Sequence, residues 1–331
     1  MYFWASYGLF TAKIFTIVFA ILILVVGILA LTRKDKSASK NKLVIKKLNE
    51  KFSELTETFQ AEILDKKSYK QYLKQKKATE KKNKASEADK KRIFVLQFQG
   101  DIKASAVASL REEITAILQV ATPNDEVLVC LESGGGLVTA YGLAASQLER
   151  IKKHNIPLTV TIDKIAASGG YMMACVANRI LAAPFAVIGS IGVVAQVPNF
   201  HRLLKKKEID FEQLTAGEYK RTLTMFGENT EKARLKFQEE IEEVHQLFKN
   251  FIQQNRPFIN IQQVATGEHW LATKAQELQL VDELTTSDDY LLNASQHAAI
   301  YEIHYTTKKS LAEKFGITIH NAYSWFNGRA L

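Results

Sequence analysis

A serine stands at the junction of a strand-like and a helix-like segment. The run 157–162 is typical of a strand, the apolar run 172–177 predicts a helix, and Ser168 lies between them in the sequence Ala166-Ala167-Ser168-Gly169-Gly170-Tyr171. A serine at such a junction can present its hydroxyl at the end of a sheet, and the glycines after it let a substrate backbone come close. Because a serine hydroxyl is a poor nucleophile, it needs a base that removes its proton.

Lys220 is our candidate for that base. It lies 52 residues after Ser168 in the sequence Gly217-Glu218-Tyr219-Lys220-Arg221. Burial in an apolar pocket disfavours the ammonium form of a lysine, so a buried lysine can accept a proton, and Ser–Lys pairs are a known catalytic arrangement. Ser190 offers a second hydroxyl that could fix the position of the amine. Spacing alone leaves Lys220 as one candidate among many lysines.

Histidine is an alternative partner for a nucleophilic serine, but the sequence nominates none. The seven histidines all lie outside the glycine-rich turns and away from candidate nucleophiles: His154, His201, His245, His269, His297, His304 and His320. The Gly-x-Ser-x-Gly pattern of a nucleophile elbow is also missing, because Ala166 occupies its first position.

Glycine-bearing turns follow the predicted strands and supply backbone N–H groups. The first turn could hold an oxyanion or a phosphate and has the sequence Ser133-Gly134-Gly135-Gly136. A phosphate-binding loop is the weaker interpretation, because the pattern GxxxxGK[ST] is absent. The N–H of Gly169 could point at the same oxyanion. A third turn has the sequence Gly189-Ser190-Ile191-Gly192-Val193.

These turns belong to a region in which predicted strands and helices alternate. The strands are expected at residues 93–98, 126–131, 157–162 and 179–182, and the intervening helices at 105–118 and 138–151. Such alternation favours βαβ units and a mainly parallel α/β sheet. A long amphipathic helix is expected at about 230–254.

The positive charge of the chain is concentrated in one segment. The net charge is +9, but residues 33–92 hold 20 of the 44 Lys and Arg and only 9 of the 35 Asp and Glu. The rest of the chain is near neutral, which argues against nucleic-acid binding as its function.

The two cysteines, Cys130 and Cys175, lie in apolar runs and are expected to be buried free thiols. No CxxC or HExxH pattern is present, and we expect neither a metal nor a cofactor.

The N-terminal region predicts a membrane anchor. Residues 14–31 are almost wholly apolar and, together with the residues from Gly8 onward, reach the roughly 20 residues that cross a bilayer as a helix. Aromatic residues just before this run match an interfacial belt: Tyr2, Trp4 and Tyr7. We expect an anchor within residues 1–32 that contacts lipid through residues 9–31. A cleaved signal peptide and a buried soluble helix are the alternatives.

A Lys-rich stalk or linker is expected at residues 33–92. Its first half carries an apolar stripe at helical spacing: Ile45, Leu48, Phe52, Leu55, Phe59 and Ile63. The stripe could pack on the main domain, pair with another copy or lie on a membrane surface. The lysines from residue 66 onward would attract anionic lipid headgroups without a specific site.

Taken together, the motifs resemble those of the signal peptide peptidase A family of serine proteases. The apolar span followed by a Lys-rich segment is most similar to the SohB branch of inner-membrane peptidases. The resemblance covers about residues 93–290, leaves 291–331 as a C-terminal extension, and includes the later sequences Thr266-Gly267-Glu268 and Leu280-Val281-Asp282-Glu283.

The resemblance implies an α/β fold like that of the ClpP protease and crotonase enzymes, with parallel βαβ units, behind the N-terminal transmembrane helix and a basic helical stalk. It implies Ser168 as the nucleophile, Lys220 as the general base and Ser190 as a hydrogen-bond partner of the lysine. The oxyanion hole would use the N–H of Gly169 and that of Gly135 or Gly136.

The resemblance also implies polypeptide substrates, either membrane-derived, signal-peptide-like or unfolded, and assembly into a ring or dome of identical chains. The expected location is the bacterial inner membrane, with a single span. The basic residues after the span favour a cytoplasmic catalytic domain, whereas the family commonly acts outside the cytoplasm, so the side stays open.

Two positions depart from the pattern of the family. Gly134 replaces the usual proline of the first turn, and Met172 replaces the usual aromatic residue after Tyr171. Neither change removes a catalytic group. Two other functions stay open: a crotonase-like acyl-CoA enzyme, and a membrane-tethered scaffold with an inactive site.

Overall fold

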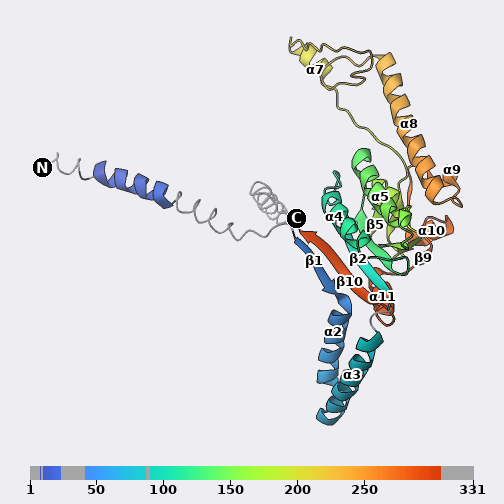
Figure 1. Cartoon of the computed structure of the whole chain (residues 1–331). Helices are drawn as coiled ribbons and strands as arrows, with labels where there is room; N and C mark the ends of the chain where they lie inside the picture. Colours follow the sequence, from blue (N-terminus) through green and yellow to red (C-terminus); the bar gives the residue numbers. More distant parts are fainter. Residues whose placement is uncertain (1–7, 9, 24–41, 87–89, 307–331) are drawn as a thin grey trace. The chain divides into compact units, whose positions relative to one another are not determined.

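The computed structural model describes residues 8, 10–23, 42–86 and 90–306, with the backbone alone for 79–86. Two units are distinguished. One comprises residues 1–42 and 306–331, of which few are described, and the other comprises residues 43–305 and holds the candidate site. The second unit is an α/β structure built around one large sheet (Figure 1).

The elements follow one another as expected for repeated βαβ units. The strands are β1 (Lys42–Lys47), β2 (Arg92–Gly100), β3 (Glu126–Ser133), β4 (Leu158–Ile162), β5 (Ile165–Ala167), β6 (Arg179–Ala182), β7 (Val187–Gly189), β8 (His269–Leu271), β9 (Glu283–Leu284) and β10 (Ala299–Thr306). The helices are α2 (Leu48–Ile63), α3 (Lys66–Ser86), α4 (Val107–Leu118), α5 (Val138–Lys153), α6 (Gly169–Ala174), α7 (His201–Lys206), α8 (Glu231–Asn255), α9 (Ile261–Val264), α10 (Ala272–Glu277) and α11 (Ser287–Ala294).

The sheet is dominated by parallel pairs. Its main path runs β1-β10-β2-β3-β4-β6-β9, and the pairs from β10 to β9 are parallel. A short branch leaves β3 where Ser133 pairs with Ala166 of β5; β7 continues it in parallel, and β8 closes it as an antiparallel strand. The expected parallel α/β architecture is confirmed, and the branch brings the ends of β3, β5 and β7 together.

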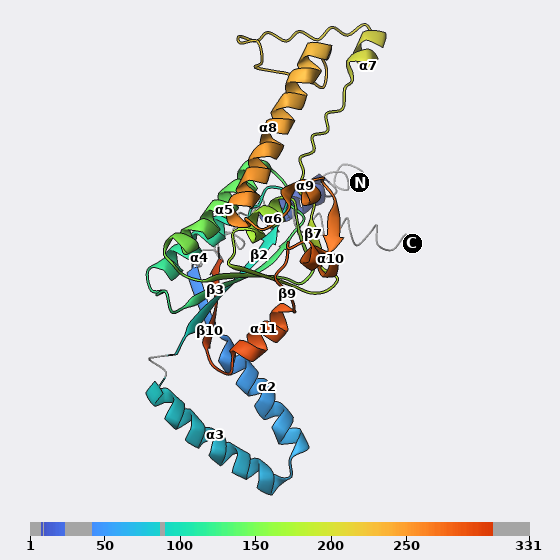
Figure 2. The same cartoon turned by 90° about the vertical axis from the view of Figure 1, so that its right-hand side faces the viewer.

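Both faces of the sheet are covered, as the alternation of side chains along β2 shows. Phe94, Leu96 and Phe98 enter the larger core, which α4, α5 and α6 cover. Ile93 and Val95 point the other way, into a smaller core formed with α11 and the start of α2. Figure 2 shows α4 and α5 on one side of the strands and α11 with α2 on the other. Burial on both faces explains the continuous apolar runs of β2 and β3.

The sheet extends beyond the expected domain limits of 93 and 290. β1 comes from the segment expected to be stalk, and β10 comes from the segment expected to be a C-terminal extension. The apolar stripe divides in the same way: Leu48 and Phe52 of α2 pack on the smaller core, whereas Leu55, Phe59 and Ile63 are exposed. The ends of the sheet are set by pairing between strands that are distant in the sequence, and the local sequence does not encode such pairing.

The described part of the N-terminal region is helical over residues 10–23, and its large apolar side chains, such as Phe15 and Phe19, are exposed. Among residues 8, 10–23, 42–86 and 90–306, no helix has both the length and the apolar character needed to cross a bilayer. Residues 24–31 of the expected span, and residues 307–331 of the expected extension, lie outside the described residues.

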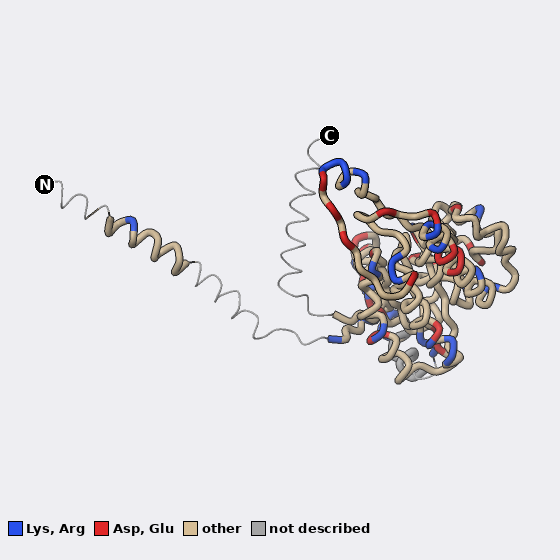
Figure 3. Tube along the Cα trace, turned by 90° about the horizontal axis from the view of Figure 1, so that it is seen from above, with Lys and Arg blue, Asp and Glu red and all other residues tan. Residues whose placement is uncertain are grey.

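A long projection, which we call the arm, comprises residues 195–236. It contains α7 and the first turns of α8, and Figures 1 and 2 show it extending away from the sheet. Helix α8 buries only Phe248 and Ile252, both near its C-terminal end. Figure 3 shows that Lys and Arg are interspersed with Asp and Glu over the described body.

An ion pair fixes the starts of the two central strands. Asp125 precedes β3, has a side chain 3% exposed, and accepts hydrogen bonds from Arg92 Nη2 at 2.6 Å and Arg92 Nε at 2.9 Å. The backbone N–H of Thr122 donates to the same carboxylate at 2.7 Å. Burial opposes ionisation of Asp125, but these hydrogen bonds outweigh it and lower the pKa of its carboxyl to about 2.

We predict that Asp125→Asn lowers the free energy of unfolding by about 2 kcal/mol at pH 7. Because the folded-state pKa is depressed, this stabilisation is present above the ordinary aspartate pKa of about 4 and is lost as the pH falls towards 2. Urea unfolding should therefore show a difference between wild type and variant that shrinks over that range. Asp210→Asn, at an exposed arm position, serves as the control; a difference independent of pH would contradict the assignment.

Candidate active site

Ser168 occupies a strained turn between β5 and α6. Its backbone has φ 52° and ψ −118°, which is uncommon for a residue with a side chain, and its N–H donates to the carbonyl of Gly189 at 2.8 Å. Residues 166, 167 and 169–174 are all buried, whereas Ser168 is half-buried. The turn therefore presents this one side chain from an otherwise enclosed segment, as the sequence predicts.

The glycine turn after β3 packs directly against Ser168. Gly135 has φ +89°, and a Cβ atom placed on it would lie 2.7 Å from the nitrogen of Gly169 and 2.8 Å from Cβ of Ser168. A Cβ on Gly169 would lie 2.4 Å from the ring of Tyr141, and one on Gly170 would lie 2.4 Å from the carbonyl oxygen of Ser133. Only glycines allow the two turns to approach this closely.

A buried chain of hydrogen bonds holds the glycine turn. The phenol of Tyr141 donates to the carbonyl of Asp101 at 2.7 Å and lies 2.6 Å from Oγ of Ser133. Because the phenol has one proton, the Ser133 hydroxyl donates to Tyr141 and accepts from the N–H of Gly135 at 3.0 Å. Burial raises the pKa of Tyr141, which keeps its phenol protonated and able to donate.

This chain decides which N–H groups could stabilise an oxyanion. The N–H of Gly135 is engaged by Ser133. Within the described part of the chain, the N–H groups of Gly136 and Gly169 donate to no other protein group. Of the two alternatives from the first turn, Gly136 is therefore the available donor, beside Gly169 at the start of α6.

Ser190 lies next to this turn. It follows β7, has φ 51°, and its N–H donates to the carbonyl of Glu268 at 2.6 Å. The bond from the N–H of Ser168 to Gly189 ties the end of β7 to the candidate nucleophile. Both serines therefore sit on neighbouring strand ends and face one space.

That space is a cleft of about 740 Å³. Its walls are the glycine turn 134–136 with Val138, Ser190 together with residues 192–194, and one face of α8; Thr266 and Gly267 also line it. Four of the predicted site residues thus line a single cleft: Gly135, Gly136, Ser168 and Ser190. Gly169 directly follows Ser168.

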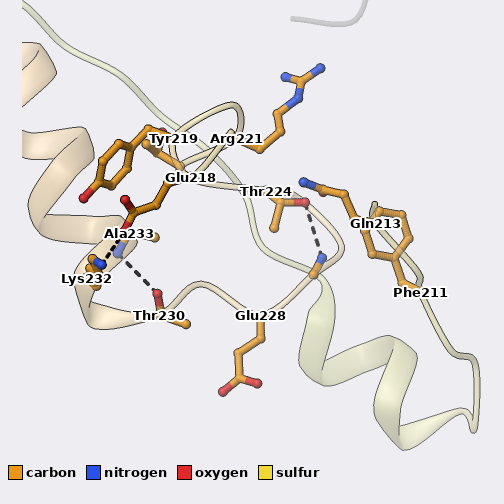
Figure 4. A pocket seen from close by; sticks show the side chains of 12 residues that line it. Phe211, Gln213, Glu218, Tyr219, Arg221, Thr224, Glu228, Thr230, Lys232 and Ala233 are labelled. Carbon is orange, nitrogen blue, oxygen red and sulfur yellow. Dashed lines mark hydrogen bonds and ion pairs between the residues drawn. The ribbon is translucent and has the colours of Figure 1, made fainter. Parts of the chain in front are cut away.

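Lys220 is not among the residues that line the cleft. It is exposed on the arm, where its N–H donates to the carbonyl of Gly217 at 3.2 Å. Figure 4 shows the two residues that precede Lys220 beside Lys232, which lies in the first turn of α8. Glu218 forms an ion pair with Lys232, and the ring centre of Tyr219 lies 5.9 Å from the ammonium of that lysine. In this conformation of one chain, the candidate base and the candidate nucleophile are on separate parts of the molecule.

The structure adds α8 to the cleft, which sequence reasoning missed. Gln238, Ile241, Glu242 and His245 line it from one face of the helix. Their spacing of three and four residues was the available signal, beside the apolar stripe of the same helix. Their role could not be recognised because it depends on how α8 packs over the cleft.

No group of three or more His, Cys, Asp or Glu residues in the described part of the chain could hold a metal ion. Cys175 is buried and Cys130 is half-buried, and both are free thiols. Burial raises the pKa of the Cys130 thiol to about 11, which disfavours a reactive thiolate.

We predict that Gly135→Ala lowers the free energy of unfolding by about 3 kcal/mol, because a Cβ there meets backbone atoms and φ is positive. Gly134→Ala is the matched control, since a Cβ on Gly134 would lie 3.8 Å from its nearest neighbour, Cδ1 of Ile165. Denaturant unfolding of both variants measures the effect. Equal stability of the two variants would contradict the close packing of the turns.

Comparison with known proteins identifies the family. The family described as peptidase family S49 N-terminal matches residues 2–148, and peptidase family S49 matches residues 150–301. A protein of Haemophilus influenzae named "Probable protease SohB" is 52% identical over 323 residues, covering 94% of this chain and 91% of its own. Two proteins of the same name come from Buchnera aphidicola. The one from subspecies Acyrthosiphon pisum is 56% identical over 234 residues, which cover 70% of this chain and 70% of its own. The one from subspecies Schlechtendalia chinensis is 49% identical over 301 residues, which cover 87% of this chain and 98% of its own.

These matches confirm the resemblance to the signal peptide peptidase A family and leave the acyl-CoA enzyme without support. They span both the N-terminal region and the α/β domain that carries the cleft. The chain belongs to the proteases of peptidase family S49 and is of the SohB type.

Proposed function

We propose that this chain is a membrane-anchored serine endopeptidase in which Ser168 is the nucleophile and Lys220 the general base. The observation that carries the proposal is the strained turn that presents Ser168 in a cleft beside the N–H groups of Gly136 and Gly169, which donate to no other group among the described residues. Such an arrangement serves acyl transfer, because the negative charge of a tetrahedral intermediate develops next to fixed donors.

The proposed reaction has two steps. In the first, Oγ of Ser168 attacks the peptide carbonyl while the amine of Lys220 takes the hydroxyl proton, and the carbonyl oxygen becomes an oxyanion bound by Gly136 and Gly169. The ammonium of Lys220 then protonates the leaving amine, which gives an acyl-enzyme. In the second step, Lys220 takes a proton from the water that attacks the ester, and its ammonium returns the proton to Oγ of Ser168 as the carboxylic acid product leaves. Ser190 orients the lysine by a hydrogen bond.

Lys220 must reach the cleft for this reaction, and we propose that assembly of identical chains brings it there. The arm exposes large apolar side chains, among them Leu203, Leu214 and Phe226, with Leu214 95% exposed. Exposed apolar side chains on a projecting segment favour packing against a partner. A ring or dome in which the arm of one copy covers the cleft of the next would bury them and complete each site.

The membrane part of the proposal rests on the N-terminal sequence. Residues 10–23 form an apolar helical segment, and the sequence stays apolar through residue 31. We propose a single span in the bacterial inner membrane and contact of the basic residues after it with anionic headgroups. Substrates would be membrane-derived, signal-peptide-like or unfolded polypeptides, because an extended chain fits a cleft between strand ends.

We predict that Ser168→Ala and Lys220→Ala each lower the hydrolysis of fluorogenic peptides by the full-length chain at least about a thousandfold, because the dyad acts as a unit. Lys206→Ala, another exposed lysine of the arm, is the control and should retain wild-type rates. Circular dichroism checks that all variants fold. Substantial activity in either folded dyad variant would refute the assignment.

We further predict that mixing the two inactive variants restores activity. If Lys220 serves the Ser168 of another copy, random co-assembly in equal amounts leaves about a quarter of the sites complete. Co-expression of differently tagged variants, followed by isolation of mixed assemblies, measures the recovery. Mixed assemblies without activity would place both residues of each site in the same chain.

A further inference from the structure

The face of α8 that lines the cleft carries polar side chains that have no role in the proposed Ser–Lys reaction. Gln238, Glu242 and His245 point into the same cleft as Ser168. Residues three, four and seven positions apart share one face of a helix, so these side chains form a continuous wall along the cleft.

Among the residues that the structure describes, Glu242 is the one carboxylate that lines the cleft, and none of their Lys or Arg side chains lines it. Its Oε1 accepts a hydrogen bond from the neutral amide of Gln238 at 2.9 Å. In the described part of the chain, no lysine or arginine forms an ion pair with Glu242, whereas neighbouring Glu239 pairs with Lys236 at 3.1 Å. The remaining lining side chains of this single chain are small or apolar, apart from hydroxyls, Gln238 and His245, so Glu242 is the charge that the chain itself places in the cleft.

His245 adds an unmet hydrogen-bonding capacity on the same wall. It lies one turn after Glu242, and its Nε2 is enclosed and has no hydrogen-bond partner within the described residues. A buried polar atom without a partner is unfavourable, and with the imidazole proton on Nδ1 this Nε2 would accept a hydrogen bond from a donor of a bound ligand. The two observations are independent, because one concerns charge and the other a vacant hydrogen bond.

We infer that this wall is a specificity site that binds a basic side chain of the polypeptide substrate. The ammonium or guanidinium group would donate to the carboxylate of Glu242 and to the imidazole of His245, while the substrate backbone passes Ser168. Charge-assisted hydrogen bonds of this kind are stronger than neutral ones. The inference rests on the proposed function, since it assigns a side-chain preference to the peptide bond that Ser168 cleaves.

The test compares internally quenched peptides that differ at one position, with lysine, norleucine or glutamate placed at each of three positions on either side of the scissile bond. With the full-length wild type, we expect one position at which the lysine peptide exceeds the norleucine peptide in kcat/KM by about tenfold. In Glu242→Gln this ratio should fall to about one. Glu239→Gln should keep the wild-type ratio, since Glu239 does not line the cleft.

Glu242→Lys is a second variant, for which we expect a new preference rather than a loss. Because the charge is reversed, the glutamate peptide should have the highest kcat/KM at that position. The inference is overturned if wild type shows no preference for lysine at any position, or if Glu242→Gln leaves the ratio unchanged. An equal loss on all peptides also overturns it, because the carboxylate would then serve the reaction itself, for example by holding Lys220. Hydrolysis that persists in Ser168→Ala would instead contradict the proposed function.

Discussion

The close approach of two glycine-containing turns is the constraint on which the site depends. The backbone of Gly135 lies against Ser168 and Gly169, at distances that leave no room for a side chain. This contact is possible because Ser133, the last residue of β3, pairs with Ala166 of β5. The hydroxyl of Ser133 also links the glycine turn to Tyr141 through hydrogen bonds. The proposed nucleophile and oxyanion donors are therefore held by the sheet itself, which is the preorganisation that acyl transfer requires.

The proposed general base, Lys220, lies on a different kind of structure. The arm that carries Lys220 buries little and projects from the sheet, whereas the residues on either side of Ser168 are buried in the fold. In the proposed enzyme this division makes activity conditional on assembly, because an isolated chain has a formed oxyanion hole but no base beside its nucleophile. A protease built in this way would be inactive until its copies meet and enclose the cleft.

Local sequence predicted the long elements and the motifs but not their pairing. Strands β2 and β3 were recognisable because they are apolar runs buried on both faces, and β4 because its apolar residues alternate with the β-branched residues Thr159 and Thr161, which are also buried. The three-residue strands β5, β7 and β8 are too short for any periodicity, and β10 joins the sheet through distant partners. In the candidate site, Ser168 and Ser190 were predicted from their turns, and the structure places both along one cleft. The engagement of the Gly135 N–H and the placement of Glu242 depend on tertiary packing and could not be predicted.

The central claim is that Ser168 forms the covalent intermediate, and trapping that intermediate tests it most directly. The full-length assembly would be mixed with an activated ester of a short peptide, quenched in acid within milliseconds to seconds, digested and mapped by mass spectrometry. The account predicts that the acyl group is found on the peptide that contains Ser168, on its hydroxyl. An acyl group on another residue, or turnover with no acylated intermediate under any quench time, would contradict it.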